Sequence, residues 1–253
     1  EFRRVLFRSN MSKSKLIKMM CIGLIGCAVY AEATEGQVQS GKEDVVHEMS
    51  TPLAENMMSQ SPINIINSIE KENQTSVTFN YKGSLATIEN LGHTVQLGVT
   101  KGQTITVNDK EFDLLQIHFH HTSEHVIDGK SYPVEAHFVH KAKDGKLAVV
   151  GVLYEEGKTN TSFDSLGELP KKKGEKRAFK ENINAMDLMP GSKSFYTYSG
   201  SLTTPPYTED VTWVVLKDSP ELSKSQIGMV QGAMHKNNRD IQDINGREII
   251  EKD

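Results

Sequence analysis

The residues best suited to chemistry in this chain are histidines spaced two apart. Residues 116–125 (QIHFHHTSEH) alternate imidazoles with apolar side chains, and residues 135–138 (EAHF) carry a further histidine. Alternation with a period of two is typical of a half-buried strand, so His118 and His120 should point to the same face of a sheet. Neutral imidazoles on one face are a natural ligand set for a transition metal.

A turn between the two runs would bring a third imidazole to this pair. Residues 128–130 (DGK) are a turn signal. The turn would fold residues 132–140 back beside the first strand and place His137 across from His118 and His120. Three histidines with no cysteine or carboxylate closing the set predict an open zinc site, because a structural site uses four protein ligands and a catalytic site keeps one position for water.

The alternative interpretation is a histidine-rich strand exposed to solvent. Glu135 argues against it, because this carboxylate lies two residues before His137 and therefore on the same face of the strand. It could accept the N–H of the ring nitrogen that does not bind metal, which fixes the tautomer and the orientation of the imidazole.

The composition favours one domain and excludes some partners. A chain of 253 residues with 37% hydrophobic residues can bury one substantial core. Its 25% charged residues and formal charge of −4 argue against nucleic-acid binding, which requires a basic face. The basic run at residues 171–173 (KKK) is predicted to be a solvated loop.

The first 33 residues are interpreted as an added segment followed by an export signal. Residues 1–10 precede a credible start at Met11 and are predicted to be an artefact of cloning or assembly. Residues 11–33 have the pattern of a signal peptide, in which three lysines precede an apolar run at residues 19–30 that is too short to span a bilayer.

Two cleavage sites compete within this signal. Residues 31–33 (AEA) suit ordinary cleavage, whereas residues 24–27 (LIGC) resemble a bacterial lipobox that would leave a lipidated Cys27. The lipoprotein interpretation is favoured. Both predict export to the periplasm, with membrane attachment only through the signal or the lipid anchor.

Short β-type runs dominate the chain beyond residue 76, and turn signals separate them. They are residues 77–81, 85–90, 95–99, 105–107, 114–120, 134–140, 147–154 and 211–216. Residues 161–166 and 223–234 have the spacing of short surface helices, and residues 34–55 are predicted to be a loosely ordered N-terminal arm.

Several short motifs then identify a family resemblance. In chain order they are QSPINI at residues 60–65, GHT at 92–94, HFH at 118–120, SEH at 123–125, EAH at 135–137, YSGSLTTPP at 198–206 and NNR at 237–239. From about Ser59 to the C-terminus, the chain resembles the α-class carbonic anhydrases of bacteria. The resemblance implies a catalytic domain at residues 56–253, of β-rich α+β class, with a twisted, mostly antiparallel central sheet of about ten strands and short surface helices.

The resemblance implies a zinc enzyme that reversibly hydrates carbon dioxide to bicarbonate and a proton. One zinc ion per chain would bind His118, His120 and His137 and lower the pKa of its bound water to about 7, an effect for which carbonic anhydrase is the usual example. Gln116 and Glu135 would accept hydrogen bonds from two of these imidazoles. Inhibition by sulfonamides is implied as well.

Thr203 matches the threonine that orients the zinc-bound hydroxide in this family. Its oxygen can accept a hydrogen bond from that hydroxide only if its own proton is donated elsewhere, and the resemblance points to Glu124 as the acceptor. The resemblance implies a substrate pocket formed by Val139, Val149, Leu202, Thr203, Thr204 and Trp213.

By its position in residues 90–94 (NLGHT), His93 matches the family's proton shuttle. An exposed imidazole, whose ordinary pKa is about 6.5, can relay protons at physiological pH. Leu91 departs from the pattern, since many relatives have an asparagine there that lines the water path. His125 is predicted to be a buried structural residue near Glu135 and Tyr198. The histidines without motif support as ligands are His47, His121, His140 and His235.

Two other functions remain open from the sequence. A catalytically silent binding module of the same fold typically lacks one of the three zinc histidines, and this chain keeps all three. A periplasmic zinc-storage or delivery protein would present histidines on flexible loops instead of strands. The oligomeric state is open, with a homodimer among the alternatives.

The cysteines generate a prediction about stability. Both of them, Cys21 and Cys27, lie inside the predicted signal, and Tyr207 occupies the position where bacterial relatives often have a disulfide cysteine. A native disulfide typically contributes about 2–4 kcal/mol. We therefore expect the midpoint of thermal unfolding to be independent of reductant, measured at saturating zinc because bound metal itself raises stability. A drop of several degrees with reductant would contradict this expectation.

Overall fold

The computed structural model describes residues 57–71 and 75–253, which belong to one compact unit. The predicted artefact, signal peptide and N-terminal arm lie outside the described residues, as do both cysteines and His47. In the part of the chain that the structure describes, no helix has the length and apolar character needed to cross a membrane.

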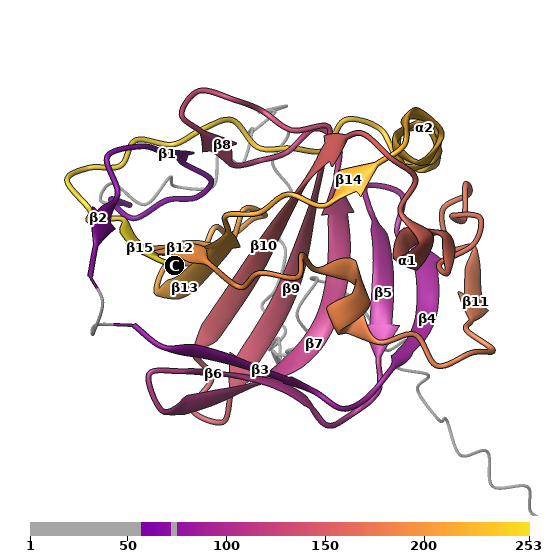
Figure 1. The fold of residues 1–253 in the computed structure, drawn as a ribbon, viewed down its shortest axis with the longest axis horizontal. Coiled ribbons are helices and arrows are strands. Elements are labelled where there is room, and N and C mark those ends of the chain that lie inside the picture. Colours follow the sequence, from indigo (N-terminus) through magenta and orange to yellow (C-terminus); the bar gives the residue numbers. More distant parts are fainter. Residues whose placement is uncertain (1–56, 72–74) are drawn as a thin grey trace, which may run out of the picture. The chain divides into compact units, whose positions relative to one another are not determined.

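A mixed sheet of 13 strands organises this unit (Figure 1). Ten of its strands follow one another in the order β11-β4-β5-β7-β9-β10-β13-β12-β15-β2, and β3, β6 and β14 branch from them. Their bounds are β2 Ile69–Glu70, β3 Val77–Tyr81, β4 Leu85–Asn90, β5 Val95–Val99, β6 Gln103–Val107, β7 Lys110–His120, β9 Val134–Ala142, β10 Leu147–Glu156, β11 Lys176–Ala178, β12 Phe195–Gly200, β13 Val211–Leu216, β14 Glu221–Leu222 and β15 Ile250–Lys252.

Most neighbouring strands of this sheet are antiparallel, as predicted. Parallel pairs occur between β10 and β13, between β10 and β14, and between β15 and β2, so the sheet is mixed. A separate two-stranded sheet joins β1 (Asn64–Ile65) to β8 (Val126–Ile127). The predicted turn at residues 128–130 follows β8 directly, and Asp128 and Gly129 both have positive φ angles.

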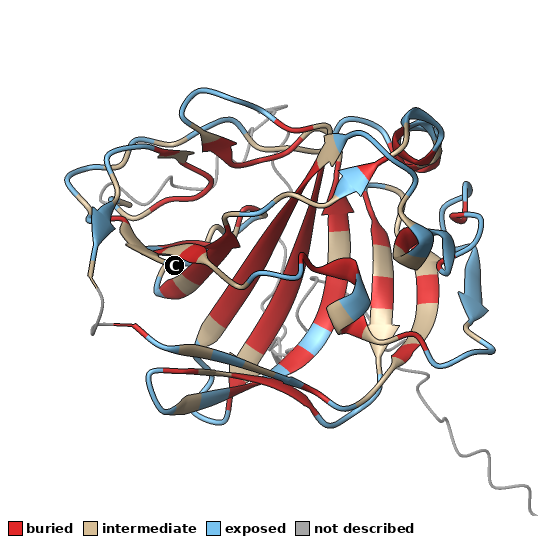
Figure 2. Ribbon diagram, viewed as in Figure 1, coloured by how far each residue is buried: buried red, intermediate tan, exposed pale blue. Residues whose placement is uncertain are grey.

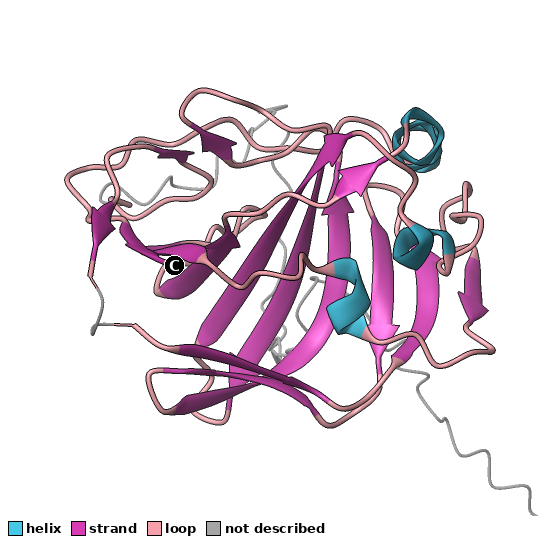
Figure 3. Ribbon diagram, viewed as in Figure 1, coloured by secondary structure: helices cyan, strands magenta, loops and turns pink. Residues whose placement is uncertain are grey.

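Within residues 57–71 and 75–253 the helices are few and short (Figure 3). They are α1 at Thr161–Asp164, the 3₁₀ helix η1 at Ala185–Leu188 and α2 at Lys224–Ala233. At the start of α2, the Ser223 side chain and the Gln226 side chain each accept a hydrogen bond from the other residue's backbone N–H, which forms a capping box. Both predicted helices are confirmed, although α1 ends earlier than expected.

Two cores lie on opposite faces of the central strands. Strands β9 and β10 are buried along nearly their whole length (Figure 2), as expected of a sheet covered on both faces. Because side chains alternate along a strand, Phe138 packs into the larger core and Val139 into the smaller one. His137 shares the face of Val139, so the predicted metal site lies on the side of the smaller core.

The larger core encloses a polar pair that the motifs do not predict. His140 Nε2 lies 2.7 Å from the Tyr81 hydroxyl, and the two rings stack with centroids 5.9 Å apart. Burial lowers the pKa of His140 to about 3. The imidazole is therefore neutral in the folded protein.

We predict that this pair makes stability depend on pH. Below pH 6.5 the unfolded chain binds a proton at His140 that the folded protein does not bind. Stability from the neutral imidazole is thus present above pH 6.5 and is lost as the pH falls toward 3, by up to about 1.4 kcal/mol per pH unit. In the double variant Tyr81→Phe/His140→Leu, the free energy of unfolding should fall less steeply between pH 6.5 and 4.

Urea unfolding of the zinc-free proteins would measure this difference. The single variant His140→Leu serves as a control, because it loses the same titration but leaves the Tyr81 hydroxyl buried without its partner, and it should be less stable than the double variant at neutral pH. Parallel pH profiles for the wild type and the double variant would contradict the assignment.

Candidate metal centre

Three imidazoles converge from the neighbouring strands β7 and β9. His118 lies directly opposite His137 in the antiparallel register, and His120 lies two residues further along β7 on the same face. Their ring centroids are 5.0 Å apart for His118 and His120, 5.2 Å for His118 and His137, and 4.4 Å for His120 and His137. The structure thus brings together the three residues that the sequence predicts.

Hydrogen bonds occupy one nitrogen on two of these rings. His118 Nδ1 lies 2.9 Å from Gln116 Oε1, and His137 Nε2 lies 2.9 Å from Glu135 Oε1. His118 Nε2 and His137 Nδ1 therefore remain as the metal-binding nitrogens. Both acceptors agree with the prediction, which for Glu135 followed from its position two residues before His137.

The third ring is held by a main-chain atom. His120 Nδ1 lies 3.4 Å from the carbonyl oxygen of Asn237 and 3.4 Å from Glu124 Oε1. His120 Nε2 is buried and has no hydrogen-bond partner among the described residues. A buried polar atom without a partner costs about 1–3 kcal/mol, and a metal ion would supply the missing partner.

These residues fit a metal ion in charge and spacing as well. The three ligand nitrogens lie within 4.8 Å of one another. Desolvation, the largest cause in each case, lowers the pKa of His118 well below its usual value, that of His120 to about 4 and that of His137 as well. The rings are therefore neutral near pH 7, and metal binding would not have to displace protons from them.

The Glu135 carboxylate is fully buried and receives four hydrogen bonds. Oε1 accepts from His125 Nδ1 at 2.7 Å and from His137 Nε2 at 2.9 Å, and Oε2 accepts from the backbone N–H groups of Glu124 and His125 at 2.8 and 2.9 Å. Burial alone would raise the pKa of Glu135, but the attraction of the two imidazoles and these hydrogen bonds hold it well below its usual range.

A second cluster of possible ligands, His125, Glu135 and His137, shares this carboxylate. His125 uses both of its nitrogens, because Nδ1 donates to Glu135 and Nε2 lies 2.7 Å from the Tyr198 hydroxyl. Both nitrogens of His125 are thus engaged in hydrogen bonds, so this cluster supports the ring of His137 and does not offer a second metal site. The predicted structural role of His125 is confirmed by these contacts.

Glycine makes room for the supports at two positions. Gly151 lies opposite His137 in β10, and a Cβ atom there would lie 3.1 Å from Glu135 Oε1. At Gly200, a Cβ atom would lie 2.1 Å from Ser61 Oγ. Ser61 Oγ in turn lies 2.8 Å from the Tyr198 hydroxyl, so Gly200 lets the segment at residues 60–65 close on the support of the metal centre.

Glu124 lies beside the imidazoles and is buried. Its Oε1 accepts the backbone N–H of Arg239 at 2.8 Å, and its Oε2 is 3.8 Å from His137 Nδ1. Burial raises the pKa of Glu124, and Thr203 is among the weaker influences that lower it. Thr203 is therefore a close neighbour of this carboxylate, although no hydrogen bond within 3.5 Å reaches Oε2 from the described residues.

The apolar residues predicted for the substrate pocket lie next to the imidazoles. Val149 pairs with Val139 on one side and with Trp213 on the other, so all three lie on the face of His137. The Trp213 ring is 4.9 Å from the His137 ring. These three are buried members of the smaller core, against which the partly buried Leu202 packs, and Thr204 is half-buried.

The predicted proton shuttle, His93, is exposed on the loop between β4 and β5. The loop leads into β5, which pairs with β7 and sets Gln96 opposite His118, so His93 lies three residues before the register position of that ligand. Asn90 shapes the loop, because its Oδ1 accepts the N–H of Gly92 at 2.7 Å, and Gly92 adopts a positive φ of 93°. Leu91 is half-buried at the position of the departure from the family pattern.

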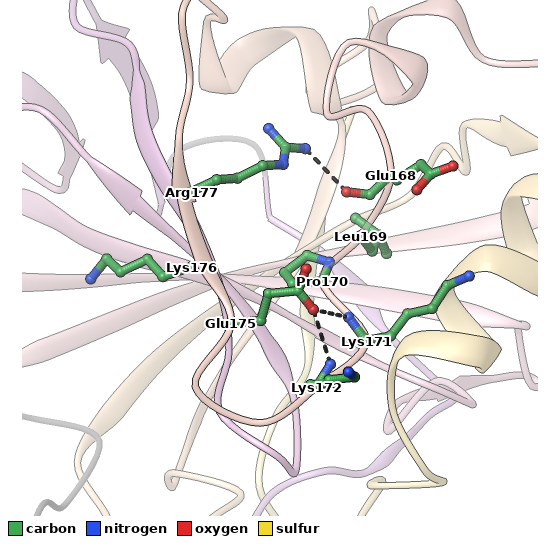
Figure 4. Close-up of a pocket in the computed structure, with 8 residues that line it drawn as sticks. All are labelled: Glu168, Leu169, Pro170, Lys171, Lys172, Glu175, Lys176 and Arg177. Atoms are coloured by element: carbon green, nitrogen blue, oxygen red, sulfur yellow. Dashed lines mark hydrogen bonds between the residues drawn. The ribbon is translucent and has the colours of Figure 1, made fainter.

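A surface pocket borders this loop and carries no metal ligands of the histidine or cysteine type (Figure 4). It is lined by Glu168, Leu169, Pro170, Lys171, Lys172, Glu175, Lys176 and Arg177. Glu175 accepts the backbone N–H groups of Lys171 and Lys172, and Arg177 donates to the carbonyl of Glu168. Residues 171–173 are exposed, in agreement with the predicted solvated loop.

Two contributions to the site come from main-chain atoms that residue types cannot reveal. They are the carbonyl of Asn237 beside His120 and the N–H of Arg239 on Glu124. Both residues belong to the motif at 237–239, so the motif pointed to the segment but not to these contacts. His121 and His235 lie outside the ligand set, as predicted.

Comparisons with known proteins agree on one family. The family model described as eukaryotic-type carbonic anhydrase matches residues 47–253. A carbonic anhydrase of Klebsiella pneumoniae is 41% identical over 203 residues, which are 78% of this chain and 81% of that one.

Solved structures give the same result. A hyperthermostable carbonic anhydrase identified from an active hydrothermal vent chimney matches with a TM-score of 0.73 and 44% identity, over 78% of this chain and 88% of that one. The α-carbonic anhydrase of Thermovibrio ammonificans in complex with the inhibitor sulfanilamide matches with a TM-score of 0.73 and 36% identity, over 76% and 87% of the two chains.

We predict that Glu135→Gln weakens zinc binding. A glutamine has one acceptor oxygen and cannot accept the four hydrogen bonds that the carboxylate receives. Loss of a residue that orients a metal-binding histidine typically lowers metal affinity about 10- to 100-fold. Competition with a chelator would measure this, with Glu111→Gln, an exposed position on β7, as the matched control. Equal affinities in the two variants would contradict the role of Glu135.

Proposed function

Since this chain belongs to the eukaryotic-type, or α, carbonic anhydrase family and interconverts carbon dioxide and bicarbonate, we propose that His118, His120 and His137 hold the zinc ion of this reaction. The observation that carries the proposal is the set of three neutral imidazoles whose uncommitted nitrogens converge, with His120 Nε2 buried and unpaired among the described residues. Three protein ligands leave the fourth position open, as in catalytic zinc sites.

A zinc ion bound here would lower the pKa of a coordinated water to about 7 and so supply hydroxide at neutral pH, an effect for which carbonic anhydrase is itself the standard case. The protein's part is to keep the three rings neutral and oriented. Gln116, Glu135 and the Asn237 carbonyl do this, because each accepts the N–H of the ring nitrogen that faces away from the metal.

Thr203 and Glu124 orient the attacking group. Glu124 is buried, and its Oε2 is free to accept the hydroxyl proton of Thr203. Once that proton is committed, the Thr203 oxygen can only accept, so it fixes the direction of the nucleophile's own proton and aims a lone pair at carbon dioxide. The raised pKa of Glu124 reflects its burial, and the Arg239 N–H keeps Oε1 occupied.

Val139, Val149, Trp213 and Leu202 form the apolar side of the substrate pocket, with Thr203 and Thr204 at its polar edge. Carbon dioxide is apolar and makes few directional contacts, so a surface that does not hold water favours it over a solvated site. The register of β9, β10 and β13 supports this assignment, because it sets the first three residues in one row beside His137.

His93 accepts the proton that each turnover releases and passes it to buffer. Its exposed position on the loop between β4 and β5, where β5 pairs with the strand that carries His118, supports this role. We also propose that the protein is exported, as the signal at residues 11–33 predicts. Sulfonamides should inhibit it, in keeping with the sulfanilamide complex of the Thermovibrio ammonificans relative.

We predict that His120→Ala loses zinc and lowers carbon dioxide hydration by about a hundredfold or more, because two imidazoles do not complete the site. Stopped-flow hydration, zinc analysis and inhibition by sulfanilamide would be measured on the same preparations. The control is His235→Ala, which removes an exposed histidine outside the cluster and should leave all three readouts unchanged. Stoichiometric zinc with wild-type activity in His120→Ala would overturn the ligand assignment.

A further inference from the structure

Tyr207 adopts a backbone conformation that is unusual for its type. Its φ angle is +61°, in the left-handed region that large side chains rarely enter. Its ring lies beneath the Arg239 guanidinium, whose central carbon is 3.8 Å from the ring centroid. A contact of this kind offsets the backbone cost, since such outliers persist only where the surroundings hold them.

Tyr207 lies in the loop that carries Thr203. The Leu202 N–H donates to the Thr208 carbonyl at 2.9 Å, and the Tyr207 N–H donates to the Thr204 carbonyl at 2.9 Å. These two bonds close the loop into a compact unit. A contact that holds Tyr207 in place therefore also restrains Thr203, which lies between Leu202 and Thr204 in this loop.

Arg239 belongs to the segment that holds Glu124. Its backbone N–H donates to Glu124 Oε1 at 2.8 Å, and its Nη1 donates to Gln60 Oε1 at 2.9 Å and to the Ser61 carbonyl at 2.7 Å. Gln60 completes the link, because its Nε2 donates to the Tyr207 carbonyl at 3.2 Å. The guanidinium is thus fixed on one side by polar bonds and on the other by the ring.

We propose that the stack of Tyr207 on Arg239 is a non-covalent clasp that fixes Thr203 relative to Glu124. Both are positioning residues, since neither touches the reacting atoms. The proposal rests on the proposed function only for its effect on catalysis.

The stack of Tyr207 on Arg239 is well suited to holding these two segments together. Both side chains are half-buried, and partial desolvation strengthens a cation–π contact. The guanidinium is planar and can stack flat on the ring while its Nη1 keeps its hydrogen bonds, which the ammonium of a lysine could not reproduce.

Three substitutions separate the clasp from other roles of Tyr207. Tyr207→Phe keeps the ring and removes the hydroxyl. Tyr207→Asn removes the ring but suits a positive φ angle, so it tests the stack without adding backbone strain. The matched control is Tyr196→Leu on β12, which removes a similar contact, since Lys217 Nζ lies 5.2 Å from the centroid of the Tyr196 ring.

The first readout needs neither zinc nor activity. In the zinc-free protein, hydrogen exchange of the backbone N–H groups of residue 207 and Arg239 reports whether the loop and the segment at residues 237–239 are held. We expect exchange at both to be about tenfold faster in Tyr207→Asn and unchanged in Tyr207→Phe and Tyr196→Leu.

The second readout is catalysis at full zinc occupancy. In Tyr207→Asn the plateau of kcat/KM at high pH should fall about five- to tenfold, because Thr203 no longer keeps its orientation. Tyr207→Phe, which keeps the ring, should keep the wild-type value of kcat/KM. Arg239→Lys, which keeps the charge and the backbone N–H, should behave like Tyr207→Asn and covers the case in which the latter does not fold.

Each outcome decides the proposal. Faster exchange together with lower kcat/KM in Tyr207→Asn and Arg239→Lys, and neither change in Tyr207→Phe, would support the clasp. Unchanged exchange in Tyr207→Asn, equal losses in Tyr207→Phe, or faster exchange with unchanged kcat/KM would overturn it. Failure of the proposed function would show as an inactive or zinc-free wild type and would leave the exchange result intact.

Discussion

The arrangement of the metal centre depends on the buried carboxylate of Glu135. A charge with no contact to water is costly unless every lone pair is engaged. Glu135 meets this condition by accepting from two imidazoles and two backbone N–H groups. The same bonds fix the ring of His137, the ring of His125 and the backbone that carries Glu124. The need of this one buried carboxylate for hydrogen-bond donors therefore sets the geometry of the site.

The scaffold divides the work between the sheet and its connections. Strands β7 and β9 set the spacing of the three imidazoles through their register, and β10 and β13 add the apolar row through theirs. Loops that close over this frame add further polar groups, among them Ser61 and His125. His125 donates to Glu135 through Nδ1, so its Nε2 accepts from the Tyr198 hydroxyl, which in turn can accept from Ser61. Hydrogen bonds thereby join two loops to strands β9 and β12, which lie far apart in sequence.

Local patterns predicted those parts of the fold that depend on neighbouring residues. Residues 77–81, 85–90, 95–99 and 211–216 were expected as strands with the bounds that the structure has, because alternation within a strand needs no knowledge of its partners. Strand β12 was not predicted, and neither was the parallel pairing of β10 with β13. The pairing of His140 with Tyr81, 59 residues away, carries no local signal except a histidine within an apolar run. The ligand set was predicted because its residues lie at fixed spacing on two strands, whereas the Asn237 carbonyl and the Arg239 N–H are main-chain groups that every residue type offers.

We infer that the hydrogen bonds around the site decide which nitrogen of each ring binds the metal. Nitrogen-15 NMR of the zinc-loaded protein measures this directly, because the chemical shifts of ring nitrogens distinguish those that carry a proton from those that bind metal. We expect His118 and His120 to bind zinc through Nε2 and His137 to bind it through Nδ1, with the His137 Nε2–H still donated to Glu135. Binding of His137 through Nε2, or the absence of a proton on that nitrogen when Nδ1 binds, would contradict the account.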